Sequence, residues 1–172
     1  MEQTMQTTTQ VITPAELLRH WQGHRTLTRR VIEAFPEQEL FSYSIGGMRP
    51  FAALAMELLG IGAPGLQEIV SGQAGTLNEH TDHGNKKENV LQLWDKATED
   101  IDRLFVQKPV AKFHDTILLF GQYEGTVWWS IFYAIDNEIH HRGQGYVYLR
   151  ALGIEPPAFC CWANFSVWPS MI

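Results

Sequence analysis

The chain has 172 residues, of which 45% are hydrophobic and 19% are charged, and its formal net charge is -6. This composition excludes wholesale disorder and predicts a globular protein long enough to bury its own core. The acidic balance, with no cluster of Lys and Arg, argues against nucleic acid as a partner.

The compartment is indicated by the cysteines and the N-terminus. The adjacent pair Cys160 and Cys161 cannot build a disulfide framework, which favours a reducing environment. The N-terminus is polar and lacks the pattern of a signal peptide, and no stretch reaches the roughly 20 apolar residues that a membrane span requires. We therefore expect a cytoplasmic protein with no membrane association.

The first predicted helix follows a lead-in over residues 1–12 that we expect to be flexible. Thr13 is a favourable N-cap, Pro14 suits the first helical position, and Glu16 places an acid in the first turn. Apolar residues then recur at helical spacing as far as about Ala34. Pro36 ends this helix.

The middle of the chain predicts two further helices and an exposed loop. The second helix covers about residues 49–61, and a cluster of Gly and Pro over 60–65 interrupts it; residues 65–70 are compatible with a short continuing helix. Residues 71–85 are polar and predict a loop, and a third helix is expected over about 86–106. Residues 112–124 fit a buried helical turn or a strand equally well.

The last long helix is predicted over about residues 126–152, with Gly153 as its C-terminal stop. One of its faces is strongly apolar and the opposite face is small and polar, which predicts a groove. The aromatic tail over 158–172 is expected to pack on the domain or on a second subunit. Four long helices in one domain, residues 13–172, predict an all-α four-helix bundle.

The last helix also carries the candidate site. Asn137 and His141 are four residues apart, so both side chains reach over the same helical turn, as two ligands of one metal do. Asp136 and His140 form a second such pair on a neighbouring face. A structural pair joined by hydrogen bonds is the commoner explanation of this spacing, and Asn is a poor ligand for borderline metals.

The segment around these pairs resembles the C-terminal signature of the DinB-like (YfiT-like) superfamily of metal-dependent enzymes. The residues that carry the resemblance are Asp136-Asn137-Glu138-Ile139-His140-His141-Arg142-Gly143-Gln144, followed by Tyr148-Leu149-Arg150, Gly153 and Pro156-Pro157. The resemblance implies a four-helix bundle, often a homodimer. It also implies a divalent metal (Zn, Ni, Fe or Mn) held by one histidine of the second helix and two histidines of the last.

Carried over to this chain, the last metal ligand is His141, the preceding one is Asn137, and the ligand of the second helix is Glu57. One of the three expected histidines is therefore present. Either these residues form a modified site richer in oxygen, which would favour harder metals, or metal binding is lost and Glu57 pairs with His141 by a hydrogen bond.

Other residues are candidates for supporting roles. Trp129, Tyr133 and His24 are expected to line a substrate pocket, although a histidine satisfied by a backbone carbonyl is the simpler interpretation of His24. Asp136, His140 and Arg142 are neighbours of the expected ligands and are candidates to orient them, as polar side chains do around metal-bound imidazoles. A surface position is the alternative for Asp136, and hydrogen bonding that fixes the last helix is the favoured interpretation of Arg142.

Two functional hypotheses follow from the resemblance. The first is a metal-dependent enzyme, either a transferase that joins a low-molecular-weight thiol to a small-molecule substrate or a hydrolase, with the metal in a groove between the second and last long helices. The second is a non-catalytic, stress-related protein with a degenerate metal site. Such a protein would bind a small ligand or act as a dimeric interaction partner.

Overall fold

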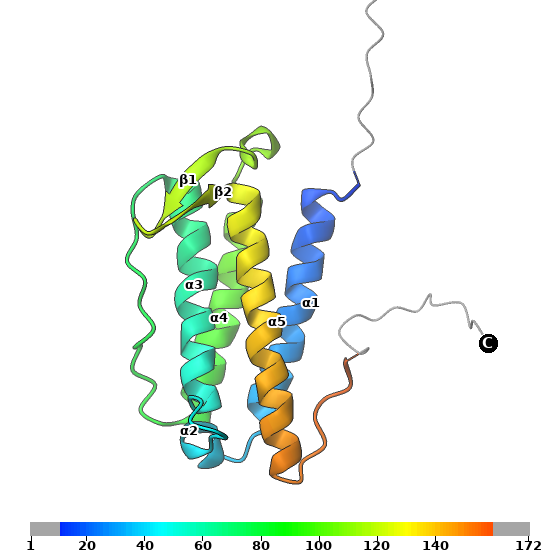
Figure 1. The fold of residues 1–172 in the computed structure, drawn as a ribbon. Helices are drawn as coiled ribbons and strands as arrows, with labels where there is room; N and C mark the ends of the chain where they lie inside the picture. Colours follow the sequence, from blue (N-terminus) through cyan, green and yellow to red (C-terminus); the bar gives the residue numbers. More distant parts are fainter. Residues whose placement is uncertain (1–10, 160–172) are drawn as a thin grey trace, which may run out of the picture.

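The computed structural model describes residues 11–159. Within that range the chain forms a bundle of four long helices, α1 (Pro14–Ala34), α3 (Phe51–Ser71), α4 (Lys87–Phe105) and α5 (Val127–Ala151) (Figure 1). The shorter elements are α2 (Glu39–Ser42), the single-turn η1 (Val110–Lys112), β1 (Thr116–Leu119) and β2 (Tyr123–Thr126). The predicted four-helix bundle is confirmed. The predictions for residues 1–10 and for the tail with Cys160 and Cys161 lie outside the described residues.

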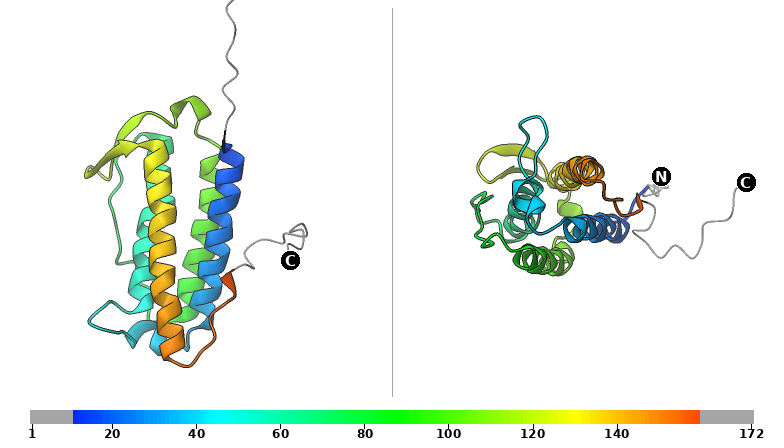
Figure 2. Two further views of the ribbon diagram at one scale, coloured as in Figure 1. Left: turned by 45° about the vertical axis from the view of Figure 1, so that its right-hand side comes forward. Right: turned by 90° about the horizontal axis from the view of Figure 1, so that it is seen from below.

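The four long helices pack as a square, in which α1 and α3 each contact both α4 and α5 (Figure 2). The loop over residues 72–86 runs back along the outside of α3, so α3 and α4 point the same way while α1 and α5 point the opposite way (Figure 1). This arrangement places α3 beside α5, the two helices that carry Glu57, Asn137 and His141.

The start of α1 is a capping box built on the predicted N-cap, Thr13. The Thr13 hydroxyl accepts a hydrogen bond from the Glu16 backbone N–H at 3.2 Å, and the Glu16 carboxylate accepts one from the Thr13 N–H at 2.8 Å. Each side chain satisfies a backbone donor that the first helical turn leaves unpaired.

Helix α3 is longer than predicted. The prediction that it is interrupted over residues 60–65 is wrong, because it continues through Pro64 to Ser71. Burial explains this result, since the glycines of that segment lie close to the loop over residues 72–86, to α1 and α4, and to the hairpin, and tertiary packing outweighs helix propensity. By length and composition α3 passes the test for a membrane span, with a mean hydropathy of 1.2, but 56% of that window is buried inside the bundle. It is the core helix of the bundle.

The ambiguous segment before α5 is an antiparallel β-hairpin, in which Thr116 pairs with Thr126 and Leu119 pairs with Tyr123. Phe120 and Gly121 adopt positive φ angles of 53° and 66° at its turn, as tight hairpin turns require. The hairpin leads directly into α5, whose first turn is capped by the Thr126 hydroxyl accepting from the Trp129 N–H at 3.1 Å.

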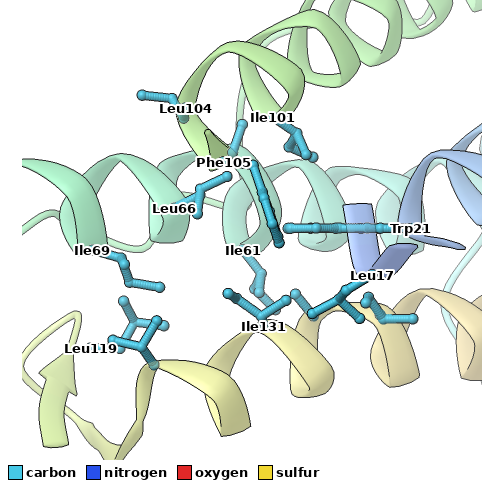
Figure 3. Close-up of a cluster of buried hydrophobic side chains, with 14 of the residues drawn as sticks. Leu17, Trp21, Ile61, Leu66, Ile69, Ile101, Leu104, Phe105, Leu119 and Ile131 are labelled. Atoms are coloured by element: carbon cyan, nitrogen blue, oxygen red, sulfur yellow. The ribbon is translucent and has the colours of Figure 1, made fainter. Parts of the chain in front are cut away.

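The core consists of two apolar clusters along the bundle. The upper cluster joins the start of α1 to the ends of α3 and α4 and the start of α5, and includes Leu17, Trp21, Ile61, Ile101 and Ile131 (Figure 3). The lower cluster contains Ile32, Phe35, Phe51, Trp94 and Tyr148. Between the two clusters along α1 and α5 lie five buried polar residues, which we call the buried polar layer: His24, Arg25, Thr28, Glu138 and Arg142.

The groove predicted along the small face of α5 is closed in the lower half of the bundle. A Cβ atom built on Gly145 would lie 2.5 Å from Cε2 of Phe51, which is fully buried and stacks on Phe35 with ring centroids 4.9 Å apart. Gly145 therefore sets the approach of α5 to α3.

Gly145→Ala is expected to destabilise the protein by about 1–3 kcal/mol, because Phe51 has no free volume into which to move. This loss occurs although alanine favours a helix by about 1 kcal/mol over glycine. The matched control is Gly143→Ala, since a Cβ atom there meets nothing within 4 Å. Urea denaturation should show a loss of stability for Gly145→Ala and a small gain for Gly143→Ala, whereas equal effects would contradict the packing argument.

Candidate functional site

The candidate site is centred on the carboxylate of Glu57 in α3. Its Oε1 atom accepts hydrogen bonds from Asn137 Nδ2 at 3.1 Å and from His141 Nε2 at 3.0 Å, both on α5. Its Oε2 atom accepts a hydrogen bond from the guanidinium of Arg49, which lies just before α3. The structure thus brings together the three residues expected to bind a metal.

The imidazole of His141 is held at both nitrogens. Nδ1 lies 2.8 Å from Oε1 of Gln144, while Nε2 faces Glu57. The ring is buried, with 7% of the residue exposed. A histidine fixed in this way keeps one orientation toward the carboxylate.

The charge of Glu57 is set by a competition between burial and hydrogen bonding. Burial raises the pKa of this carboxyl, but the hydrogen bonds from Arg49, then from Asn137 and His141, lower it more and hold the pKa below its ordinary value. Glu57 is therefore an anion whose charge is balanced by a guanidinium. Nothing in the sequence marked Arg49 as the partner of Glu57, because Arg49 belongs to no periodic pattern or motif; the structure places it just before α3 rather than at the start of the predicted helix.

These residues do not fit the divalent metal that the DinB-like resemblance implies. The carboxylate already accepts three hydrogen bonds, and the Arg49 guanidinium places a positive charge where a metal cation would have to bind. Asn137 turns an amide N–H toward Glu57, although a ligating amide would offer its oxygen. Across residues 11–159 no group of three or more His, Cys, Asp or Glu side chains is arranged to hold a metal ion.

A pocket lies beside Glu57, between α3, α5 and the β-hairpin, with a cavity volume of about 70 Å³. Trp129 and Tyr133, two of the expected pocket residues, line it together with Phe120 and Tyr123 of the hairpin segment. Glu79, from the loop over residues 72–86, is a second acidic group in the lining. In this upper half of the bundle α3 and α5 do leave a hollow between them.

The third expected pocket residue, His24, lies elsewhere. It belongs to the buried polar layer, where its Nδ1 atom accepts a hydrogen bond from Arg142 at 2.9 Å. Arg142 follows His141 by one residue, and the step of about 100° per helical residue turns it toward α1 instead of α3. His24 thus lies away from the pocket, and Arg142 makes hydrogen bonds that tie α5 to α1 instead of contacting His141.

The remaining candidates are on the surface of α5. Asp136 and His140 are exposed to solvent, and the ring of His140 meets the ring of His141 edge to face with centroids 5.1 Å apart. Among the hydrogen bonds of the described residues, neither Asp136 nor His140 has one to Asn137 or His141.

The sequence analysis did not single out Arg25 and Glu138, two charged residues of the buried polar layer. Glu138 is 2% exposed and accepts a hydrogen bond from the Thr28 hydroxyl at 2.6 Å, with Arg25 and Arg142 at 3.8 and 4.0 Å. A signal was present, because Glu138 and Arg142 continue the spacing of the buried residues Ile131 and Ile135 along α5.

The comparisons with known proteins agree with this fold. The family model described as the DinB family matches residues 5–166. Two solved structures are similar, a DinB-like protein from Bacillus cereus (13% identity, TM-score 0.69, covering 84% of this chain and 95% of that one) and a DinB-like protein from Bacillus subtilis (21% identity, TM-score 0.68, covering 83% and 96%). Among curated proteins none matches. The bundle, the signature on α5 and the match over residues 5–166 together show that this chain belongs to the DinB family.

Proposed function

We propose that this DinB-family chain is a small-molecule-binding protein whose pocket works without a metal. The observation that supports the proposal is the hydrogen bonding of the Glu57 carboxylate. Its carboxylate is satisfied by Arg49, Asn137 and His141 at the edge of a pocket with aromatic walls. A concave, mostly apolar hollow with a few convergent polar groups is the usual form of a ligand site.

The pocket is attractive for a ligand because three of its four aromatic side chains are not part of the core, whereas the fourth, Phe120, is buried in it. Trp129, Tyr133 and Tyr123 are 48%, 41% and 41% exposed. Large aromatic side chains gathered around a hollow mark an interaction site more often than solitary exposed residues do. The polar network around Glu57 would give such a ligand a fixed partner for hydrogen bonding.

The second candidate is the metal-dependent thiol transferase or hydrolase. One observation favours it: His141 is bonded through Nδ1 to Gln144 while Nε2 faces the carboxylate. Metal-ligating histidines commonly use their second nitrogen in this way. This candidate requires a cation to displace Arg49 from Glu57.

Metal content separates the two candidates. After dialysis against mixed Zn²⁺, Ni²⁺, Fe²⁺ and Mn²⁺, elemental analysis of the wild type is expected to find no stoichiometric metal. A chelator should leave the melting temperature unchanged, since a bound metal would stabilise the fold by mass action. Stoichiometric metal that is lost in Glu57→Ala and His141→Ala but kept in the exposed control His140→Ala would overturn the proposal.

Ligand binding is tested by saturation-transfer NMR with small apolar and aromatic fragments in the presence of EDTA. Fragments are expected to bind the wild type and to lose binding in Trp129→Ala. Val147→Ala is the matched control, because Val147 is an exposed apolar residue of the same helix, 55% exposed, and does not line the pocket. Binding that appears only when a divalent metal is added would support the enzyme instead.

A further inference from the structure

The pocket beside Glu57 combines aromatic side chains with carboxylates. Phe120, Tyr123, Trp129 and Tyr133 supply the aromatic groups, and Glu57 and Glu79 supply the acids. The described residues that line it include no Lys, Arg or His. This combination is chemically selective, because aromatic faces and carboxylates both attract positive charge.

The aromatic wall is held in a fixed position. Trp129 stacks on Tyr133 with ring centroids 5.6 Å apart and an angle of 20° between the planes. A Cβ atom built on Gly125 would lie 2.6 Å from the Trp129 ring. Because Gly125 has no side chain, the indole of Trp129 can lie directly against strand β2. The hairpin therefore positions the wall before any ligand arrives, which lowers the entropic cost of binding.

The second carboxylate is positioned by a close contact between the loop and α3. A Cβ atom built on Gly60 would lie 2.5 Å from the backbone oxygen of Asn78, so the loop touches the helix at a residue that must be small. Glu79 follows Asn78 directly, and Glu57 precedes Gly60 by one helical turn. The contact thereby brings the two acids to one pocket although they come from different elements.

The charges of this region sum to a negative value. Arg49 is bonded to Glu57 and lies 3.7 Å from Oε2 of Glu79, so one guanidinium serves two carboxylates. Side-chain exposure is 14% for Glu57 and 30% for Glu79, so their field is only partly screened by water. Burial first, and then the negative charge of Glu57, raise the pKa of the Tyr133 phenol. An anionic ligand would meet the same repulsion.

We infer that the pocket takes a small organic cation, an ammonium group carried on an apolar or aromatic body. The ammonium group lies near Glu79 and Glu57, and the body packs on Trp129, Tyr133 and Tyr123. This inference rests on the proposed function, since it assigns a ligand class to the pocket that works without a metal. It also predicts that thiolates and carboxylates are poor ligands there.

The test uses three probes of similar shape and different charge: phenethylammonium, phenethyl alcohol and hydrocinnamate. Their affinities are measured by isothermal titration calorimetry on the full chain in EDTA. The cation is expected to bind about tenfold more tightly than the alcohol, from cation–π and carboxylate attraction, and the carboxylate to bind most weakly. Higher ionic strength should weaken the binding of the cation more than that of the alcohol.

Two variants and a control locate the binding. Glu79→Gln, on an exposed loop, is expected to weaken the cation about threefold and to leave the alcohol unchanged. Trp129→Ala should weaken the cation about tenfold. Glu99→Gln makes the same charge change at an exposed position of α4 and should alter neither affinity.

Outcomes that overturn the inference differ from those that overturn the proposed function. If the alcohol or the carboxylate binds as tightly as the cation, and Trp129→Ala weakens it, the pocket binds small molecules but does not select a cation. If none of the three probes binds, the choice of a cation is also wrong. The proposed function is judged separately, by the metal content and by the fragment binding in EDTA.

Discussion

Replacing Glu138 with alanine is expected to destabilise the protein by about 3–5 kcal/mol, which is the usual cost of breaking a buried ion pair by removing one partner. Glu138 is the carboxylate of the buried polar layer, and it faces two guanidiniums, Arg25 and Arg142, that are 1% and 2% exposed. Burial lowers the pKa of Arg25 to about 10, which still leaves it charged at neutral pH. Without Glu138, Arg142 loses its acidic partner and Arg25 keeps only the weaker attraction of Asp95.

Urea denaturation at neutral pH measures this loss, and thermal unfolding should show a fall in melting temperature of about 10 °C for a chain of this length. Glu99→Ala on the exposed face of α4 is the control and should change stability by less than about 0.5 kcal/mol. Joint replacement of Glu138, Arg25 and Arg142 by apolar residues of similar size should recover most of the stability, because the desolvated charges are then removed together. Equal stability of Glu138→Ala and wild type would mean that water reaches the layer.

Acidification is expected to destabilise the fold through His24. Burial, followed by the positive charge of Arg142 and the neighbouring His20, lowers the pKa of His24 from 6.5 to about 4. The geometry agrees, because Arg142 can only donate, and so Nδ1 of His24 must accept and carry no proton. The unfolded chain takes up a proton below pH of about 6.5 while the folded chain resists it. The contribution of His24 to the free energy of unfolding is therefore fully present above that pH and falls by about 3 kcal/mol toward pH 4.

The measurement is the free energy of unfolding across this pH range for the wild type, His24→Gln and the control His114→Gln, which replaces an exposed histidine. His24→Gln should lose much less stability on acidification than the other two proteins. Glu138 acts in the opposite sense, since burial raises its pKa and protonation then favours the folded state. All three proteins retain Glu138, so its contribution cancels when their pH profiles are compared. A wild type and His24→Gln with parallel pH profiles would contradict the assignment to His24.

Much of the fold was predictable because its signals are local. The capping box at Thr13 and Glu16, the apolar periodicity of α1 and the stop at Gly153 each depend on residues within a turn or two of one another. The DinB-like signature placed the site on α5 and pointed to Glu57, and the structure joins that residue to Asn137 and His141.

The bundle and three of its four long helices could be predicted from the sequence, and the DinB-like resemblance indicated that Glu57, Asn137 and His141 meet. Other features became apparent only from the three-dimensional packing, because they depend on residues far apart in the chain. Tertiary packing allows α3 to continue through Pro64. The contact between Gly60 and the loop over residues 72–86 positions Glu79 at the pocket. Because successive residues of α5 project about 100° apart, Arg142 contacts His24 on α1 while His141 contacts Glu57 on α3. Arg49 could be recognised as the partner of Glu57 only in three dimensions, since an ion pair depends on the distance between charges and not on their separation in sequence.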